Sequence, residues 1–240
     1  MFDNLRSFTY LYFGLLVVHL GVEFVDMQAV RLFTKPIFMV LLLVFHFLNA
    51  KGDKSYFSRM VRFGLLFSWF GDIALMFDKQ WPIFFVVGLA AFLIGHVGYA
   101  LAFFNSIRLS DGTINTRVWL ASIFPFATFS AIFFFVMKDG IVAADPNLLI
   151  PVLAYTIVIT VMGVMASLRH GLTAPKDYVW ILAGAILFIL SDVIIAVDKF
   201  MFDFDHNTVA NGILYFTAQY LIMAGSLHYL AYRRGEVAAN

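Results

Sequence analysis

Long apolar runs recur along the whole chain. Eight of them can be delimited, at residues 8–24, 33–49, 59–77, 82–104, 117–137, 147–168, 177–198 and 208–232, and short clusters of charged residues separate them. The hydrocarbon core of a bilayer is about 30 Å thick, and about 20 helical residues are needed to cross it. A β-barrel would instead show short segments of alternating polarity. The pattern therefore predicts an all-α, polytopic membrane bundle of eight transmembrane helices.

The composition argues against a water-soluble globular domain. Hydrophobic residues make up 62% of the chain and charged residues 13%, whereas soluble domains have about 45–50% and about 25%. The chain has no cysteine, which excludes a disulfide framework and a thiolate metal site, and its net charge of +1 does not indicate nucleic-acid binding. Because the loops are short, we expect one integral membrane domain over residues 1–240, in contact with the lipid bilayer.

Basic residues near the ends of the apolar runs indicate an orientation, since cytoplasmic loops carry an excess of Lys and Arg. With eight spans, both termini lie on one side of the membrane. That side carries eleven Lys and Arg residues and the other side five, although the segment from Lys51 to Arg62 alone supplies four of the eleven. The tally predicts that both termini are cytoplasmic, in the inner membrane if the source is bacterial.

Two aspartates lie inside the apolar runs. Asp72 occurs in FSWFGDIALMFDK and Asp192 in FILSDVIIAVDKF, 120 positions apart in a chain of 240 residues, and each is followed at the same offset by an Asp-Lys pair. An ionisable residue at such a depth is a functional-site hypothesis. The offset predicts two parallel four-helix repeats, residues 1–115 and 116–240, with one buried carboxyl group in each. Chance recurrence at helix ends is the alternative.

Other polar residues share helix faces with these aspartates or form faces of their own. Residues three or four positions apart in a helix lie on the same face. Ser68 therefore shares a face with Asp72, and Ser191 is adjacent to Asp192. Two further runs carry polar faces, formed by His96 and Tyr99 in the fourth run and by Asn211, Tyr215 and Gln219 in the eighth.

Depth in the bilayer decides which of these residues can meet. At about 1.5 Å per residue, both aspartates lie in the outer half of the bilayer, and Tyr155 and Tyr215 reach the same level from the outer face. Lys35 lies at the outer edge, whereas His96 lies deeper than the aspartates, which argues against a contact with them and leaves its role open. We predict an outward-opening polar pocket whose candidate residues, besides Asp72 and Asp192, are Lys35, Ser68, His96, Tyr99, Tyr155, Ser191, Tyr215 and Gln219.

A pair of buried carboxyl groups can carry out proton transfer. Two such groups close together in a site of low dielectric do not both ionise readily, so one keeps its proton while the other stays charged, and they titrate as a pair. The pair then supplies a general acid and a general base at neutral pH. The sequence contains no Gly-x-Ser-x-Gly, no His-Glu-x-x-His and no Cys-His pair, so we expect neither Ser-His-Asp catalysis nor a strong metal site. Structural hydrogen bonding by each aspartate remains the alternative.

Several short motifs follow one another in a specific order. They are Lys35-Pro36, Ser68-x-x-Gly71-Asp72, then Gly88, Phe92, His96 and Tyr99, then Pro151-x-x-x-Tyr155, Gly184-Ala185-x-x-Phe188-x-x-Ser191-Asp192 and Tyr215-x-x-x-Gln219. In this order and spacing, over nearly the whole chain, the motifs resemble those of the YhhN family of membrane proteins, whose eukaryotic members are described as lysoplasmalogenases.

The resemblance implies a hydrolase that cleaves the vinyl ether bond of lysoplasmalogens to a fatty aldehyde and glycerophosphoethanolamine or glycerophosphocholine. Vinyl ether hydrolysis needs protonation of the β-carbon, followed by attack of water on an oxocarbenium-like centre. Asp72 and Asp192 would form the acid–base pair, in an order that the sequence leaves unassigned. The substrate would be a lysophospholipid, and no metal or organic cofactor is required.

The resemblance also implies roles for neighbouring residues. Tyr155, Tyr215 and Gln219 would position water or the reacting oxygen, and Lys35 would bind the phosphate as a compact cation. Headgroup preference, chain preference and oligomeric state do not follow from the sequence.

Two other classes of function fit the same residues. An ion-coupled or lipid transporter would also use repeats and buried carboxyl groups, but the chain shows no clear pair of broken helices at matching positions. A non-catalytic lipid-binding or assembly protein would be indifferent to the loss of either aspartate.

Overall fold

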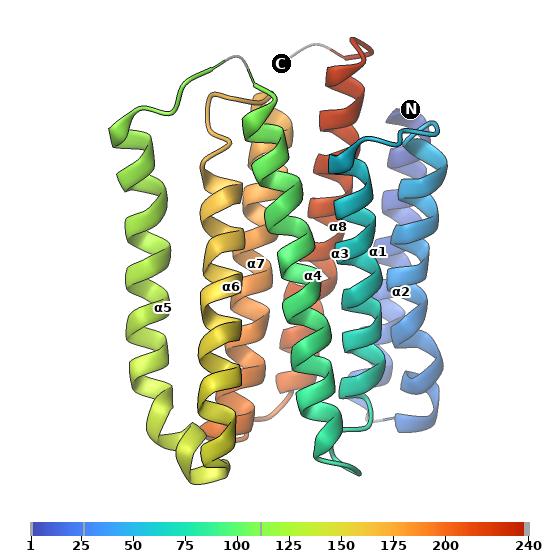
Figure 1. The fold of residues 1–240 in the computed structure, drawn as a ribbon. Helices are drawn as coiled ribbons and strands as arrows, with labels where there is room; N and C mark the ends of the chain where they lie inside the picture. The colour runs from blue at the N-terminus through green and yellow to red at the C-terminus, as the bar shows by residue number, and fades with distance from the viewer. Residues whose placement is uncertain (1, 26, 111, 238–240) are drawn as a thin grey trace.

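The computed structural model describes residues 2–25, 27–110 and 112–237, which form eight α-helices and one short 3₁₀ helix and contain no strand. The α-helices are α1 (Phe2–Phe24), α2 (Gln28–Asn49), α3 (Tyr56–Leu75), α4 (Ile83–Arg108), α5 (Thr116–Ala144), α6 (Leu149–Ser167), α7 (Pro175–Phe200) and α8 (Asn207–Arg233), and the 3₁₀ helix η1 (Pro146–Leu148) precedes α6. They lie side by side in one bundle (Figure 1). The all-α fold is confirmed, with one helix for each predicted run.

Local sequence signals explain where several helices begin. The side chain of Ser55 accepts a hydrogen bond from the backbone N–H of Ser58 at 3.2 Å and caps α3, and Asn115 caps α5 through Val118 at 2.9 Å. Such caps satisfy backbone donors that a helix start leaves unpaired. Pro175 occupies the first turn of α7, where its missing N–H costs no hydrogen bond.

Within the described residues, six helices are long and apolar enough to cross a membrane, namely Asn4–Phe24, Ala29–Asn49, Ile83–Arg108, Thr116–Ala144, Pro146–Ser167 and Pro175–Phe200. The remaining two, α3 and α8, run alongside them (Figure 1). Helix α8 is the most enclosed, and it buries the polar residues Gln219, Ser226 and His228. Because its neighbours separate it from lipid, α8 does not need an apolar surface. The eight-helix bundle is thus established, while eight complete spans stay a prediction.

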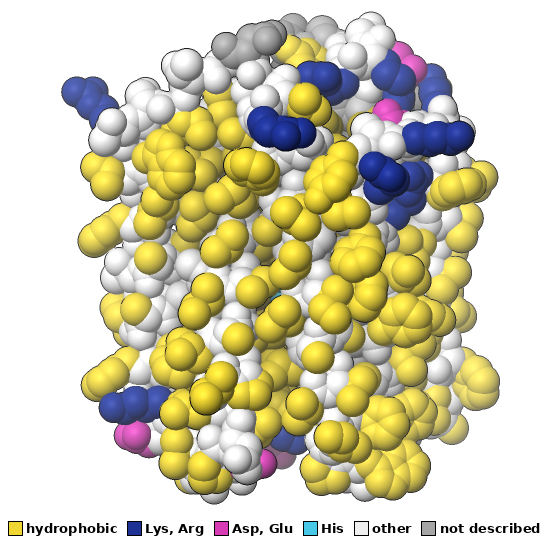
Figure 2. Space-filling model, in the orientation of Figure 1, with side chains coloured by type: hydrophobic (Ala, Val, Ile, Leu, Met, Phe, Trp, Pro, Cys, Tyr) yellow, Lys and Arg dark blue, Asp and Glu magenta, His cyan; other side chains and the backbone are white. Residues whose placement is uncertain are grey.

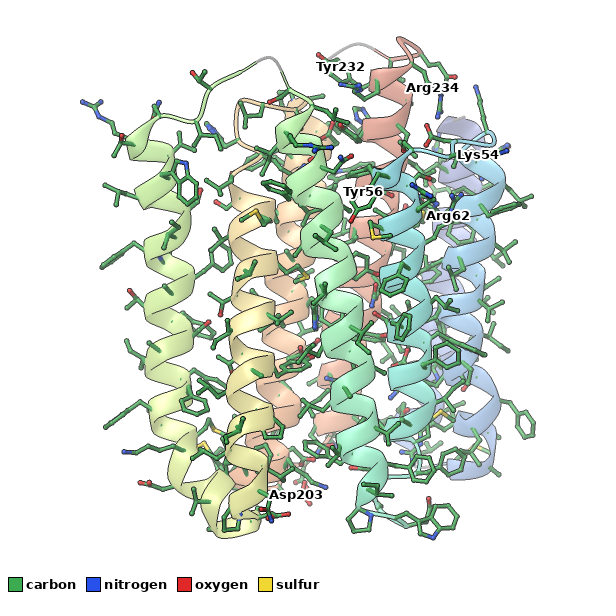
Figure 3. All side chains as sticks on the ribbon, in the orientation of Figure 1. Lys54, Tyr56, Arg62, Asp203, Tyr232 and Arg234 are labelled. Atoms are coloured by element: carbon green, nitrogen blue, oxygen red, sulfur yellow. The ribbon has the colours of Figure 1, made fainter. Side chains whose placement is uncertain are left out.

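The surface has the polarity expected of a membrane protein. Figure 2 shows apolar side chains over the middle of the bundle and charged side chains gathered near its two ends. Helix α1 begins and α8 ends at the same end of the bundle (Figure 1). Lys54, Arg62 and Arg234 lie toward that end, and Asp203 lies at the opposite one (Figure 3).

Glycines bring two helix pairs, α3 with α4 and α7 with α8, into close contact. A Cβ atom at Gly71 of α3 would lie 2.6 Å from the ring of Phe92 on α4. A Cβ atom at Gly184 of α7 would lie 2.9 Å from the backbone oxygen of Ala218 on α8. Small residues at such crossings let the two backbones approach closely, so that van der Waals contacts can hold the helices together where the hydrophobic effect does not act between them. The two aspartate-bearing helices, α3 and α7, are therefore each held tightly against one partner.

The first helices of the two halves pack differently. Helix α1 packs against α2 and α8, whereas α5 packs against α6 and α7. Across the described residues, no Cα atom of α5 lies within 8 Å of a Cα atom of α4, although α4 is the helix that would correspond to α8. The division into two repeats, 1–115 and 116–240, stays a prediction, and any such repeats would differ at this point.

Candidate active site

Asp192 lies on α7 beside a tyrosine and a histidine. The hydroxyl of Tyr155 on α6 donates a hydrogen bond to Oδ2 of Asp192 at 2.5 Å. Nε2 of His96 on α4 lies 3.9 Å from the same oxygen, and the His96 ring packs edge-on against Tyr155 with centroids 5.3 Å apart. Three helices thus converge on one carboxyl group.

The position of His96 corrects the depth estimate from the sequence, which argued against a contact between His96 and an aspartate. Side chains in an α-helix lean toward its N-terminus. Helices α4 and α7 run in opposite directions (Figure 1). His96 and Asp192 therefore lean toward each other, which a count of residues along each axis does not include.

Asp72 lies on α3 in a second group with its own tyrosine. The hydroxyl of Tyr215 on α8 donates to Oδ2 of Asp72 at 2.7 Å. Tyr99 donates to Oε1 of Gln219 at 2.5 Å and also interacts with Ser68, and all three are buried. The predicted levels of Tyr155 and Tyr215 agree with these contacts, because each tyrosine reaches one aspartate.

Aromatic rings pack between the two groups. The ring of Phe188 lies 4.5 Å from that of His96 and 5.4 Å from that of Tyr215, measured between centroids. Phe92 packs edge-on against both Phe188 and Tyr215. Over the described part of the chain, no hydrogen bond or ion pair joins Asp72 to Asp192. Each carboxyl group is instead paired with a tyrosine, where the sequence suggested a single pair sharing one pocket.

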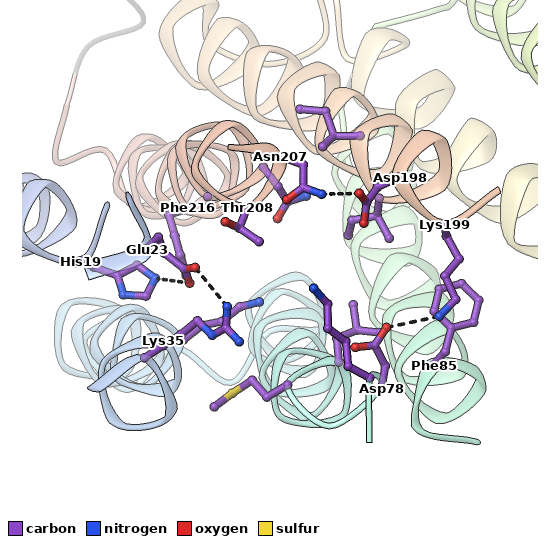
Figure 4. A pocket seen from close by; sticks show the side chains of 18 of the residues that line it. His19, Glu23, Lys35, Asp78, Phe85, Asp198, Lys199, Asn207, Thr208 and Phe216 are labelled. Atoms are coloured by element: carbon purple, nitrogen blue, oxygen red, sulfur yellow. Dashed lines mark hydrogen bonds and ion pairs between the residues drawn. The ribbon is translucent and has the colours of Figure 1, made fainter. Parts of the chain in front are cut away.

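A cavity of about 200 Å³ with many charged lining residues, which we call the vestibule, lies at the end of the bundle opposite the termini (Figure 1 and Figure 4). Its charged lining residues are Glu23, Arg31, Lys35, Asp78, Lys79, Asp198 and Lys199. Arg31 pairs with Glu23 at 3.4 Å and Lys199 with Asp78 at 3.5 Å, and Asn207 donates to Asp198. Lys35 and Lys79 have no ion pair among the described residues, so their charges are available to an anionic ligand.

A second cavity, of about 80 Å³, adjoins the vestibule and is lined mostly by apolar side chains; we call it the apolar cavity. Leu75, Phe85 and Ile195 line both and form a shared wall. Asp192 and Tyr155 line the apolar cavity, and they are the ionisable groups among its described lining residues.

The other predicted residues divide by position. Lys35 lines the vestibule, but neither Asp72 nor Asp192 is among its described lining residues. The hydroxyl of Ser191 donates a hydrogen bond to the backbone oxygen of Phe188 in the same helix, so its contact is internal to α7. Ser68, Tyr99 and Gln219 form the buried network behind Asp72. The described lining residues of the two cavities include none of Ser68, Tyr99, Ser191 and Gln219.

Some site residues were missed by the sequence interpretation. Glu23 at the end of α1 lines the vestibule, and Phe129 and Phe133 of α5 line the apolar cavity, but none of the three was a candidate residue. One phenylalanine among 29 carries no signal of such a role. As for metals, the described residues contain no group of three or more His, Asp or Glu side chains positioned to hold an ion.

Comparisons with known proteins agree on one family. The model of the YhhN family matches residues 30–226. The human lysoplasmalogenase TMEM86B is 29% identical over 181 residues, which cover 75% of this chain and 69% of the human protein. The corresponding protein of Rattus norvegicus is 28% identical over 75% of this chain and 67% of its own, and a lysoplasmalogenase homolog of Dictyostelium discoideum is 27% identical over 77% and 63%. Solved structures gave no significant match.

Proposed function

Because this integral membrane protein belongs to the YhhN family, we propose that it hydrolyses the vinyl ether bond of lysoplasmalogens. Its relatives from human and rat are named lysoplasmalogenases. The proposal makes the chain a hydrolase whose substrate is a lysophospholipid of the surrounding bilayer.

One observation supports this function best: the carboxyl group of Asp192 lines an apolar cavity that adjoins a vestibule containing unpaired cations. A lysoplasmalogen has its reactive bond where the polar glycerophosphate meets the hydrocarbon chain. With the phosphate near Lys35 and the chain in the apolar cavity, that bond would lie beside Asp192. An amphipathic ligand therefore suits the two cavities better than a purely polar one.

Asp192 can supply both proton transfers. In its acid form it gives a proton to the β-carbon of the vinyl ether, and the carboxylate that remains stabilises the positive charge shared by the α-carbon and the ether oxygen. It then accepts a proton from the water that attacks the α-carbon. The hemiacetal collapses to a fatty aldehyde and the glycerol hydroxyl, with its own hydroxyl proton passing to the leaving oxygen. One water is consumed and Asp192 is again an acid.

Other residues would support these steps. Tyr155 would hold the carboxyl group through its 2.5 Å hydrogen bond. Asp72 is not among the described lining residues of either cavity, but the charge of Lys35 acts on it through space. We assign Asp72 a supporting electrostatic role beneath the vestibule. With cytoplasmic termini, as the charge tally predicts, the vestibule would face the outer side of the membrane.

The test is the release of free fatty aldehyde from lysoplasmenyl-ethanolamine by the purified, detergent-solubilised protein. The alkyl-ether analogue serves as the substrate control, because without the double bond it cannot form the oxocarbenium centre by protonation. Aldehyde from the first lipid alone is the expected result. No aldehyde from a folded preparation, or lipid flux without product in proteoliposomes, would overturn the proposal.

Headgroup binding has its own test. Replacing Lys35 with Gln removes the cation and should raise KM by about ten- to a hundredfold, since a hydrogen bond to a charged group contributes about 1.5–3 kcal/mol. Lys138→Gln, at the same end of the bundle on α5, is the matched control. Equal KM values in the two variants would show that Lys35 does not bind the headgroup.

A further inference from the structure

The apolar cavity extends well beyond Asp192. Helix α6 contributes Val152 and Thr156 to its lining, and α7 contributes Val193 and Ala196. Residues of α3 and α4 form one side of the lining, and residues of α5, which packs against both α6 and α7, form another. The lining of the cavity therefore connects the carboxyl group of Asp192 with α5, which lies at the edge of the bundle (Figure 1).

Its few hydroxyl groups are already satisfied. Thr156 donates to the backbone oxygen of Val152 at 2.8 Å, and Ser130 accepts a hydrogen bond from Thr160 at 2.6 Å. Apart from the Asp192–Tyr155 pair, the lining thus offers little to a polar ligand. A hydrocarbon chain can occupy such a space without leaving a polar group unpaired.

The far end of the cavity meets the surface that faces the bilayer. Phe129 of α5 lines the cavity and is also 42% exposed. Its ring stacks on that of Phe133, another lining residue, with centroids 6.0 Å apart and planes 5° apart. These two rings mark the point where the cavity and the lipid meet.

We propose that the hydrocarbon chain of the lysolipid lies in the apolar cavity from Asp192 to Phe129 and leaves the protein sideways into the bilayer beside α5. Phe129 and Phe133 then determine which chains are accepted. The inference rests on the proposed function, because the vinyl ether carbons begin the chain and must lie at Asp192. The packing of α5 supports the proposal, because among the described residues α5 contacts α6 and α7 but not α4 and therefore lies at the outside of the helices that line the cavity.

The first experiment uses an alkyl-ether lysophospholipid with a diazirine in the distal part of its chain, photolysed on the wild-type protein and mapped by mass spectrometry. Label is expected on α5 around Phe129 and Phe133. Excess unlabelled alkyl-ether lysolipid should displace it, and diacyl phospholipid should not. Absence of label from α5, or equal displacement by both lipids, overturns the proposal. Because the probe is not a vinyl ether, labelling of α5 without any hydrolase activity would separate this inference from the proposed function.

The second experiment tests the proposal with a variant whose apolar cavity is narrowed by a larger side chain. Ala196→Phe places a ring in its lining, whereas Ala131→Phe makes the same change at an exposed position of α5. The first variant should lose the α5 label at least tenfold and should discriminate against long chains relative to short ones. The second should match the wild type. If Ala196→Phe folds and labels α5 as well as Ala131→Phe does, the chain lies elsewhere.

Discussion

Asp72 and Asp192 occupy matching positions in the sequence but different surroundings in the bundle. Asp72 is 2% exposed and is enclosed by Tyr215 and the buried Tyr99–Gln219 pair. The side chain of Asp192 is 14% exposed and lines a cavity. Both carboxyl groups accept a hydrogen bond from a tyrosine. The two aspartates therefore differ in whether a ligand can reach the carboxyl group, and not in the polar partner of that group.

The helices around the aspartates produce this difference. In the first half, α1 packs against α2 and α8. In the second half, α5 packs against α6 and α7 and stays away from α4, and the apolar cavity lies among these helices. A recurring motif can therefore set a carboxyl group into each half, while the neighbouring helices decide which one a ligand can reach.

The largest expected effect is that of Asp192→Asn. Without an acidic group at the cavity, the rate of aldehyde formation should fall by about 10²–10⁴-fold, the usual contribution of general acid–base catalysis. Asp139→Asn on the exposed side of α5 is the matched control and should retain full activity. The aldehyde assay at saturating substrate measures both, and a fully active Asp192→Asn variant would end the assignment.

Asp72→Asn should reduce activity by less than tenfold. The amide has nearly the same shape, and its oxygen can still accept the hydrogen bond from Tyr215, so only the electrostatic support is lost. The measurement is kcat alongside the thermal stability of the detergent-solubilised variant. A loss of activity as large as that of Asp192→Asn would contradict the different roles given to the two aspartates and would support an acid–base pair formed by both.

Much of the fold could be predicted from the sequence, because bilayer thickness fixes the length of an apolar helix. Each predicted run became one helix, and the levels of Tyr155 and Tyr215 were correct because a helix rises by a constant amount per residue. The end of α5 was placed too early, at residue 137, although the helix continues to Ala144. A lysine and an aspartate follow residue 137, and charged residues end an apolar pattern without ending a helix.

The access to the two aspartates could not be predicted. Their flanking residues are alike, and the difference lies in tertiary packing that no short motif encodes. The same limit applies to His96, whose contact with Asp192 depends on two side chains leaning toward each other from antiparallel helices. Phe129 could not be recognised among the other phenylalanines either, because it lines the apolar cavity only through the position of α5 in the bundle.

The two tyrosines should differ in a smaller but measurable way. Tyr155→Phe removes the donor to Asp192 and should lower kcat/KM about two- to tenfold, since a hydrogen bond contributes about 0.5–1.5 kcal/mol. Tyr215→Phe should leave kcat/KM within about twofold and lower thermal stability instead, by the same hydrogen-bond contribution. Tyr220→Phe, which loses only a contact with Thr9, is the matched control. A stronger effect on activity from Tyr215 than from Tyr155 would reverse the assignment of the two groups.

The smallest expected effect is the coupling between these two tyrosines. They share no hydrogen-bond partner among the described residues, and the rings of Phe92 and Phe188 pack between their groups. The effects of Tyr155→Phe and Tyr215→Phe on kcat/KM should therefore add within about 0.5 kcal/mol in the double variant. A coupling energy above about 1 kcal/mol would mean that the aromatic rings transmit the state of one group to the other. In that case Asp72 would act on the reaction through Phe92 and Phe188, and the enclosed aspartate would belong to the same catalytic unit as the accessible one.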